Sequence, residues 1–184
     1  MMRETADIFP LQKTRMHEVC GAGAHAFAVL LAAQYDAPLL WVRAGWRTEQ
    51  LNPPGFVGLL DPDKLLVASA KNDTDVLAVA EESLRSGVLP LVVMELASPL
   101  DLTAGRRLQL AAKAGPSTAL AIIPEGMGSN AAQTRWRCSP VYDPDDSTLL
   151  RCELIKNKSG TLGVWNVRWS QTARRINMVS EAGM

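Results

Sequence analysis

The sequence predicts an α/β fold, in which a mostly parallel sheet flanked by helices is extended by antiparallel strands near the C-terminus. Up to residue 123, short and almost wholly apolar runs alternate with helical segments, which is typical of parallel strands buried on both faces. Beyond residue 134, apolar and polar residues alternate one by one, as in antiparallel strands with one wetter face. A glycine-rich turn joins the first strand to the first helix.

The predicted parallel strands follow from their apolar runs. The first strand ends at Val19, and a helix over residues 24–35 follows the glycine turn. Further buried strands are expected at residues 38–43, 65–70, 89–96 and 118–123. Right-handed crossovers between such strands place helices on both faces of the sheet.

Two more helices have clear start and stop signals. One is expected to run to Arg85, because Asp73 or Thr74 can cap its start and Gly87 stops the helix. The other is expected over residues 101–114, because residues 115–116 are Gly-Pro.

The antiparallel part is expected to contain strands at residues 136–141, 149–155 and 162–169. Residues 157–160 form a hairpin turn, and the acidic residues 143–146 join the other pair. Few large apolar side chains follow, so we expect one domain over residues 1–169 and a flexible tail over residues 170–184.

Composition excludes several classes of protein. Of the 184 residues, 47% are hydrophobic, and 19 basic residues balance 19 acidic ones. The chain therefore lacks the positive charge of an autonomous nucleic-acid binder, and it lacks an apolar run long enough to span a membrane. The N-terminus does not resemble a secretory signal, so a cytoplasmic location is expected. The three cysteines have no metal-site spacing, which predicts buried free thiols and no metal site.

The glycine turn lies where a nucleotide-binding domain would carry its phosphate loop. Gly21, Gly23, Ala24 and His25 occupy this position, but no lysine lies between Lys13 and Lys64, and the turn has no hydroxyl residue before the helix. A working loop needs that lysine for the outer phosphates and the hydroxyl for magnesium. The sequence thus predicts a degenerate loop, no bound cofactor and no catalytic residue.

Five segments in order resemble the ImuA family of bacterial mutagenesis proteins, which has a RecA-like fold; the division inhibitor SulA is a more distant relative. The segments are residues 17–19, 40–43, 100–112, 134–137 and 163–169, and the resemblance covers about residues 15–169. Residues 60–67, 84–87 and 91–96 also resemble RecA itself.

This resemblance implies a non-catalytic adaptor in SOS-induced translesion synthesis and mutagenesis. The implied partners are an ImuB-like homologue of Y-family polymerases, RecA, and indirectly an error-prone replicative-type polymerase. Two alternatives remain open: a SulA-like inhibitor of cell division, and a weak nucleotide-binding homologue of the RecA-like ATPases.

Residues that serve ATP and DNA in RecA have no clear counterpart in this chain. Arg43 stands where a carboxylate would activate water, and Met94 occupies the expected position of a magnesium-binding aspartate. We expect Glu95 on the opposite face in a capping or surface role, with magnesium binding as the alternative. The loops at residues 97–100 and 124–135 are too short for full DNA-binding elements, which predicts weak or absent DNA binding.

Partner-binding candidates are exposed aromatic and basic residues: Trp46, Arg135, Trp136, Arg174 and Arg175. Trp46 lies in a loop and suits either an interface anchor or simple packing. The arginines also suit a solvated surface. His17 is expected to be a hydrogen-bonded structural residue, and His25 either a surface residue or a donor to an anion.

Overall fold

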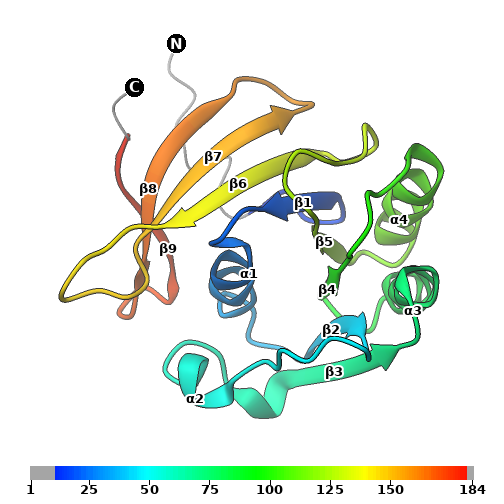
Figure 1. The fold of residues 1–184 in the computed structure, drawn as a ribbon, viewed down its shortest axis with the longest axis horizontal. Helices are drawn as coiled ribbons and strands as arrows, with labels where there is room; N and C mark the ends of the chain where they lie inside the picture. Colours follow the sequence, from blue (N-terminus) through cyan, green and yellow to red (C-terminus); the bar gives the residue numbers. More distant parts are fainter. Residues whose placement is uncertain (1–10, 182–184) are drawn as a thin grey trace.

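The computed structural model describes residues 11–181, with side chains up to residue 179. These residues form a nine-stranded mixed sheet in the order β3-β2-β4-β5-β1-β6-β7-β8-β9 (Figure 1). Strands β1 to β6 are joined by parallel pairings, and β6 to β9 are antiparallel. This confirms the predicted RecA-like α/β class with its antiparallel extension.

The parallel strands correspond to the apolar runs of the sequence. They are β1 (Met16–Cys20), β2 (Leu39–Ala44), β3 (Leu65–Ala70), β4 (Leu91–Glu95) and β5 (Thr118–Ile122). Four of them are buried throughout, but the expectation for β3 is wrong. It is the edge strand of the sheet, and Leu66 and Val67 are each about half exposed.

Helices cover the two faces of the parallel sheet unequally. Helix α1 (Ala24–Ala32) lies on one face, while α3 (Asp73–Ser86) and α4 (Leu102–Ala114) pack side by side on the other (Figure 1). Gly87 ends α3 in the left-handed conformation, as expected. A short helix, α2 (Pro53–Phe56), and a 3₁₀ turn at Pro62–Lys64 lie between β2 and β3.

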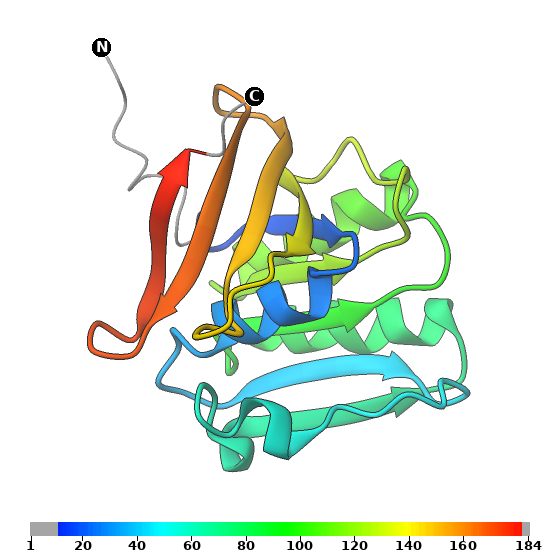
Figure 2. The ribbon, with the colours of Figure 1, turned by 60° about the vertical axis from the view of Figure 1, so that its left-hand side comes forward.

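The antiparallel extension consists of β6 (Thr134–Pro140), β7 (Leu150–Asn157), β8 (Gly163–Ser170) and β9 (Arg175–Glu181). It bends around α1, so that β6 and β9 both contact this helix (Figure 2). Helix α1 is therefore enclosed between the parallel and antiparallel strands. Enclosure explains why apolar side chains lie almost all round it.

Strand β9 corrects the expectation of a flexible tail from residue 170. Residues 175–181 pair with β8, and Ile176 is buried in the same core cluster as α1. The sequence signal was weak because β9 is an edge strand that buries few side chains. The remaining tail residues, 182–184, and residues 1–10 of the predicted domain lie outside the described part.

The three cysteines are free and buried, as predicted. Within residues 11–181, no helix has both the length and the apolar character required to cross a membrane.

Candidate functional site

The glycine turn at the start of α1 packs directly against strand β6. A Cβ atom on Gly21, whose φ is +90°, would lie 2.5 Å from the carbonyl oxygen of Cys138, and one on Gly23 would lie 2.9 Å from the Cys138 carbonyl carbon. The Gly23 amide donates a 2.8 Å hydrogen bond to the Cys138 carbonyl, and the Ala24 amide donates to Gly21. These glycines allow close packing on β6. The Gly23 and Ala24 amides, which a bound phosphate would require as donors, already form hydrogen bonds within the protein.

A charged network lies beside this turn, at the carboxyl ends of β2 and β4. Its centre is the carboxylate of Glu95, which is 1% exposed. Trp41 Nε1 donates to Glu95 Oε1 over 2.7 Å, and Arg43 Nη2 lies 3.3 Å from Glu95 Oε2. Arg47 Nε approaches Oε2 to 3.6 Å, and His25 Nε2 approaches Oε1 to 3.5 Å.

The network keeps a buried carboxylate ionised. Burial alone would raise the pKa of Glu95, but hydrogen bonds from His25 and Trp41, with the charges of His25 and Arg43, lower the pKa below its usual value. At neutral pH the carboxylate is therefore negative and matched by the arginines.

The position of Glu95 corrects one expectation and confirms another. It is neither a surface nor a capping residue. As expected, it lies on the face opposite Met94: its carboxylate is on the α1 face, whereas Met94 packs in the apolar cluster beneath α3 and α4. Arg43 occupies the position where a RecA-like ATPase would have a water-activating carboxylate, and it forms an ion pair with Glu95. Sequence reasoning missed that Trp41 and Arg43, at a spacing of two residues, share one face of β2, the face on which the Glu95 carboxylate lies.

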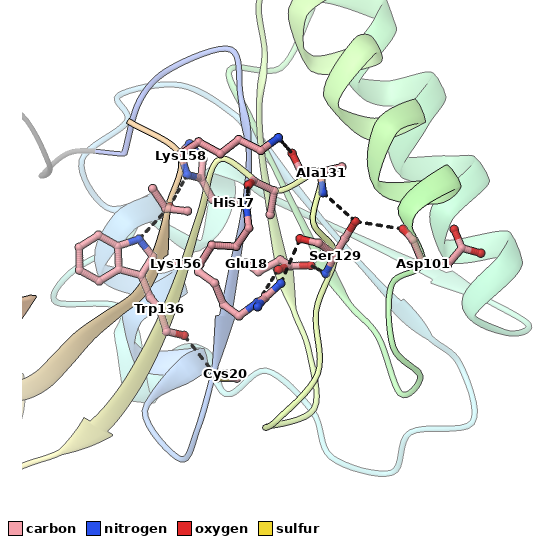
Figure 3. A network of polar contacts seen from close by, with 12 residues as sticks. His17, Glu18, Cys20, Asp101, Ser129, Ala131, Trp136, Lys156 and Lys158 are labelled. Atoms are coloured by element: carbon pink, nitrogen blue, oxygen red, sulfur yellow. Dashed lines mark hydrogen bonds and ion pairs between the residues drawn. The ribbon is translucent and has the colours of Figure 1, made fainter. Parts of the chain in front are cut away.

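A second buried network joins β1, β6 and the connection before β6 (Figure 3). Arg135 Nε donates to Glu18 Oε2 over 2.7 Å, and its Nη2 donates to the Ser129 carbonyl over 3.0 Å. The Ser129 amide donates to Glu18 Oε1 over 2.7 Å. Burial raises the pKa of Glu18, although these donors oppose the shift. Arg135 therefore has an internal role, and its side chain remains 18% exposed.

Trp136 is also an internal residue, and the expectation that it contacts a partner is wrong. It is fully buried, and its ring lies 5.9 Å from that of Phe27 and 6.0 Å from that of Trp165. Its indole donates to Thr134, which bonds in turn to Nδ1 of His17. The alternation of β6 places Trp136 toward α1, and sequence reasoning could have found this from the period of two.

His17 has the structural role that the sequence predicted. Its Nδ1 lies 2.6 Å from Thr134 Oγ1, and its Nε2 lies 2.8 Å from the Gln12 carbonyl. Burial lowers the pKa of His17 to about 4; the hydrogen bond to Gln12 opposes this shift, and the charge of Arg15 adds to it.

The other three candidates lie on the surface. Trp46 is 60% exposed, and the Arg47 guanidinium lies 5.4 Å from its ring. Arg174 has a φ of +47°, donates to the Leu59 carbonyl and lies over the ring of Trp169. Arg175 is exposed in β9. The structure thus does not bring the five candidates together in one site.

No family model matches the sequence. The chain is 31% identical to Protein ImuA of Caulobacter vibrioides, in both strain NA1000 / CB15N and strain ATCC 19089 / CIP 103742 / CB 15; each match covers 81% of this chain and 72% of the relative. The chain belongs to the ImuA family. In this ImuA-family chain, the Glu95 network lies at the carboxyl ends of β2 and β4 beside α1, and the glycine turn packs on β6.

Proposed function

We propose that this chain is a non-catalytic adaptor in SOS-induced translesion synthesis and mutagenesis, acting through contacts with an ImuB-like homologue of Y-family polymerases. One observation supports the non-catalytic part most directly. Arg43 and Glu95 neutralise each other where a RecA-like ATPase would need free groups for magnesium and water. Family membership supports the setting in mutagenesis.

An exposed apolar edge supports the adaptor role. Strand β3 ends the sheet, and Leu66 and Val67 on it are 51% and 52% exposed. The Gly45 amide donates to the Ala70 carbonyl over 2.7 Å, which ties the start of the Trp46 loop to the end of this strand. An unpaired edge strand with exposed apolar side chains suits the addition of a strand or loop from another protein.

Co-purification tests this proposal. The full chain is expected to form a stable complex with the ImuB-like protein of its own organism, and Val67→Lys or Trp46→Ala should weaken that complex at least tenfold. Tyr142→Ala is the matched control, because Tyr142 is 89% exposed but lies in the β6–β7 connection. Binding to the tubulin-like division protein in place of the ImuB-like protein would favour the SulA-like alternative and overturn the proposal.

A further inference from the structure

A groove of about 420 Å³ lies on the outer side of α4, away from both the Glu95 network and strand β3. Leu102 and Leu110 of α4 and Ala131 give it apolar walls, and Arg106 and Lys158 lie at its rim. Leu102 is 43% exposed and Leu110 is 67% exposed. The groove therefore exposes apolar surface that the fold itself does not cover.

The spacing of these residues on α4 forms one stripe. Leu102, Arg106 and Leu110 follow each other at intervals of four, so they lie on one face of the helix. The helix already buries Gly105, Leu108, Ala111 and Ala112 toward the sheet. The stripe is thus separate from the core-facing side, and the exposed leucines are not needed to hold α4 in place.

The wall opposite α4 is held rigidly. Gly105 has no side chain, and a Cβ atom there would lie 2.3 Å from Ser129 Oγ, so the connection before β6 packs directly on the helix. Ser129 Oγ donates to the Asp101 carbonyl over 3.1 Å and accepts from the Ala131 amide over 3.1 Å (Figure 3). Lys158 Nζ donates to the Ala131 carbonyl over 2.8 Å. The groove is therefore preformed, which lowers the entropy cost of binding.

Unmatched positive charge lies around the groove. Arg106 and Lys158 line the groove and form no ion pair with an acidic side chain among the described residues. Lys158 donates to the Ala131 carbonyl, and Lys156, which lies outside the lining, donates to the Ala132 carbonyl. Glu18, the acidic group of the neighbouring network, is bonded to Arg135. Burial, with the adjacent charges of Lys158 and Arg135, lowers the pKa of Lys156, and the charge of Glu18 opposes this shift.

We infer that this groove binds an acidic, leucine-bearing segment of another protein. Acidic side chains on the segment would pair with Arg106 and Lys158, while its apolar side chains contact Leu102 and Leu110. These leucines are eight residues apart on α4, a rise of about 12 Å. Two apolar side chains four residues apart on an extended segment, or eight apart on a helix, span a similar distance. The inference does not depend on the ImuB-like partner, since it concerns a different surface.

Synthetic peptides test the inference on the full chain. The probes are fluorescein-labelled peptides of Glu and Ala that carry two leucines spaced by four or by eight residues. One of the two spacings is expected to bind with a Kd below about 100 μM at low salt. Peptides with Lys in place of Glu, or Ala in place of Leu, should bind at least tenfold more weakly.

Variants locate the binding on the protein. Lys158→Glu and Leu110→Gln should each weaken peptide binding at least tenfold, and both residues are exposed enough for the fold to tolerate the change. Leu66→Gln on β3 and Lys71→Glu, which lie outside the groove, should leave it unchanged. Failure of every peptide to bind below 1 mM would overturn the inference. So would tighter binding of oligo(dT) that depends on Lys158 but not on Leu110, because that pattern indicates a nucleic-acid surface. Loss of the ImuB-like complex alone would contradict only the proposed function.

Discussion

Trp41 and Glu95 lie on neighbouring parallel strands, and the indole of Trp41 donates a 2.7 Å hydrogen bond to the Glu95 carboxylate. The bond holds one carboxylate oxygen, while Arg43 and Arg47 approach the other. The carboxyl ends of β2 and β4 are therefore stabilised by an internal ion-pair network.

The Arg43–Glu95 pair is expected to show strong energetic coupling. Arg43→Met leaves a buried carboxylate with less compensation and should lower the free energy of unfolding by about 3 kcal/mol. The same substitution in a Glu95→Gln background should cost about 1 kcal/mol, because the charge is then absent. Urea unfolding of the four proteins measures this cycle. Arg47→Met is the matched control and should cost less, since Arg47 is more exposed and lies 3.6 Å away; additive effects of Arg43→Met and Glu95→Gln would contradict the prediction.

Binding of MgATP is expected to be no tighter than millimolar, and hydrolysis to be absent. The turn carries no lysine, the Gly23 and Ala24 amides are committed, and Glu95 is held by arginines. A lysine and free amide donors supply most of the charge neutralisation that bound phosphates need, and a free carboxylate would hold the magnesium ion. Isothermal titration calorimetry of the purified chain measures the affinity. A Kd in the micromolar range would show that the turn still holds phosphate and would favour the weak nucleotide-binding alternative.

Gly21 is expected to be required for packing on β6. Gly21→Ala combines a strained φ of +90° with a Cβ atom 2.5 Å from the Cys138 carbonyl oxygen, and should cost about 3 kcal/mol or more. Gly126→Ala is a close control, because Gly126 has a φ of +81° and no atom within 4 Å of the added Cβ. It should cost about 1 kcal/mol. Chemical denaturation measures the free energy of unfolding of both variants. Equal decreases would mean that the contact with Cys138 does not contribute to the cost of Gly21→Ala.

The buried His17 makes stability depend on pH. Its pKa is about 4 in the folded chain and 6.5 for an unperturbed histidine side chain, so the folded state favours the neutral ring. The contribution of His17 to the free energy of unfolding is fully present above pH 6.5 and is lost as the pH drops from 6.5 toward 4. The loss is about 2 kcal/mol between pH 7 and pH 5. Denaturation series at several pH values measure this loss. His17→Gln should remove it, whereas His25→Gln, at the chain's other histidine, should retain it; an unchanged slope in His17→Gln would refute the assignment.

The sequence predicted the strands up to β8, because their positions depend on local patterns of apolar and polar residues. Residues 65–70 show the limit: their apolar run is the same at an edge as in the centre, and only the strand order places β3 at the edge. The Glu95 network was missed because its members come from β2, β4 and α1, which meet only after the crossovers form. The sequence suggested that Arg135 was available to a partner, because Glu18, with which it pairs, is 117 residues away in the chain.

Strand β9 is expected to contribute to stability, contrary to the interpretation of the C-terminal residues as a tail. Ile176 is 6% exposed and packs in the cluster around α1, and its amide donates to the Gln34 side chain over 3.3 Å. Ile176→Ala removes buried apolar atoms and should cost about 2 kcal/mol. Val179→Ala is the control on the same strand, where the side chain is 48% exposed, and should cost less than about 0.5 kcal/mol.

Removal of residues 171–184 extends this prediction to the whole strand. The truncated chain loses the pairing of β8 with β9 and uncovers part of the α1 cluster, so its melting temperature should fall by about 10 °C or more. Thermal melting of the full and truncated chains measures the fall, and co-purification with the ImuB-like protein shows whether binding is lost with the fold. A truncated chain with an unchanged melting temperature and no partner binding would mean that β9 serves the complex and not the fold.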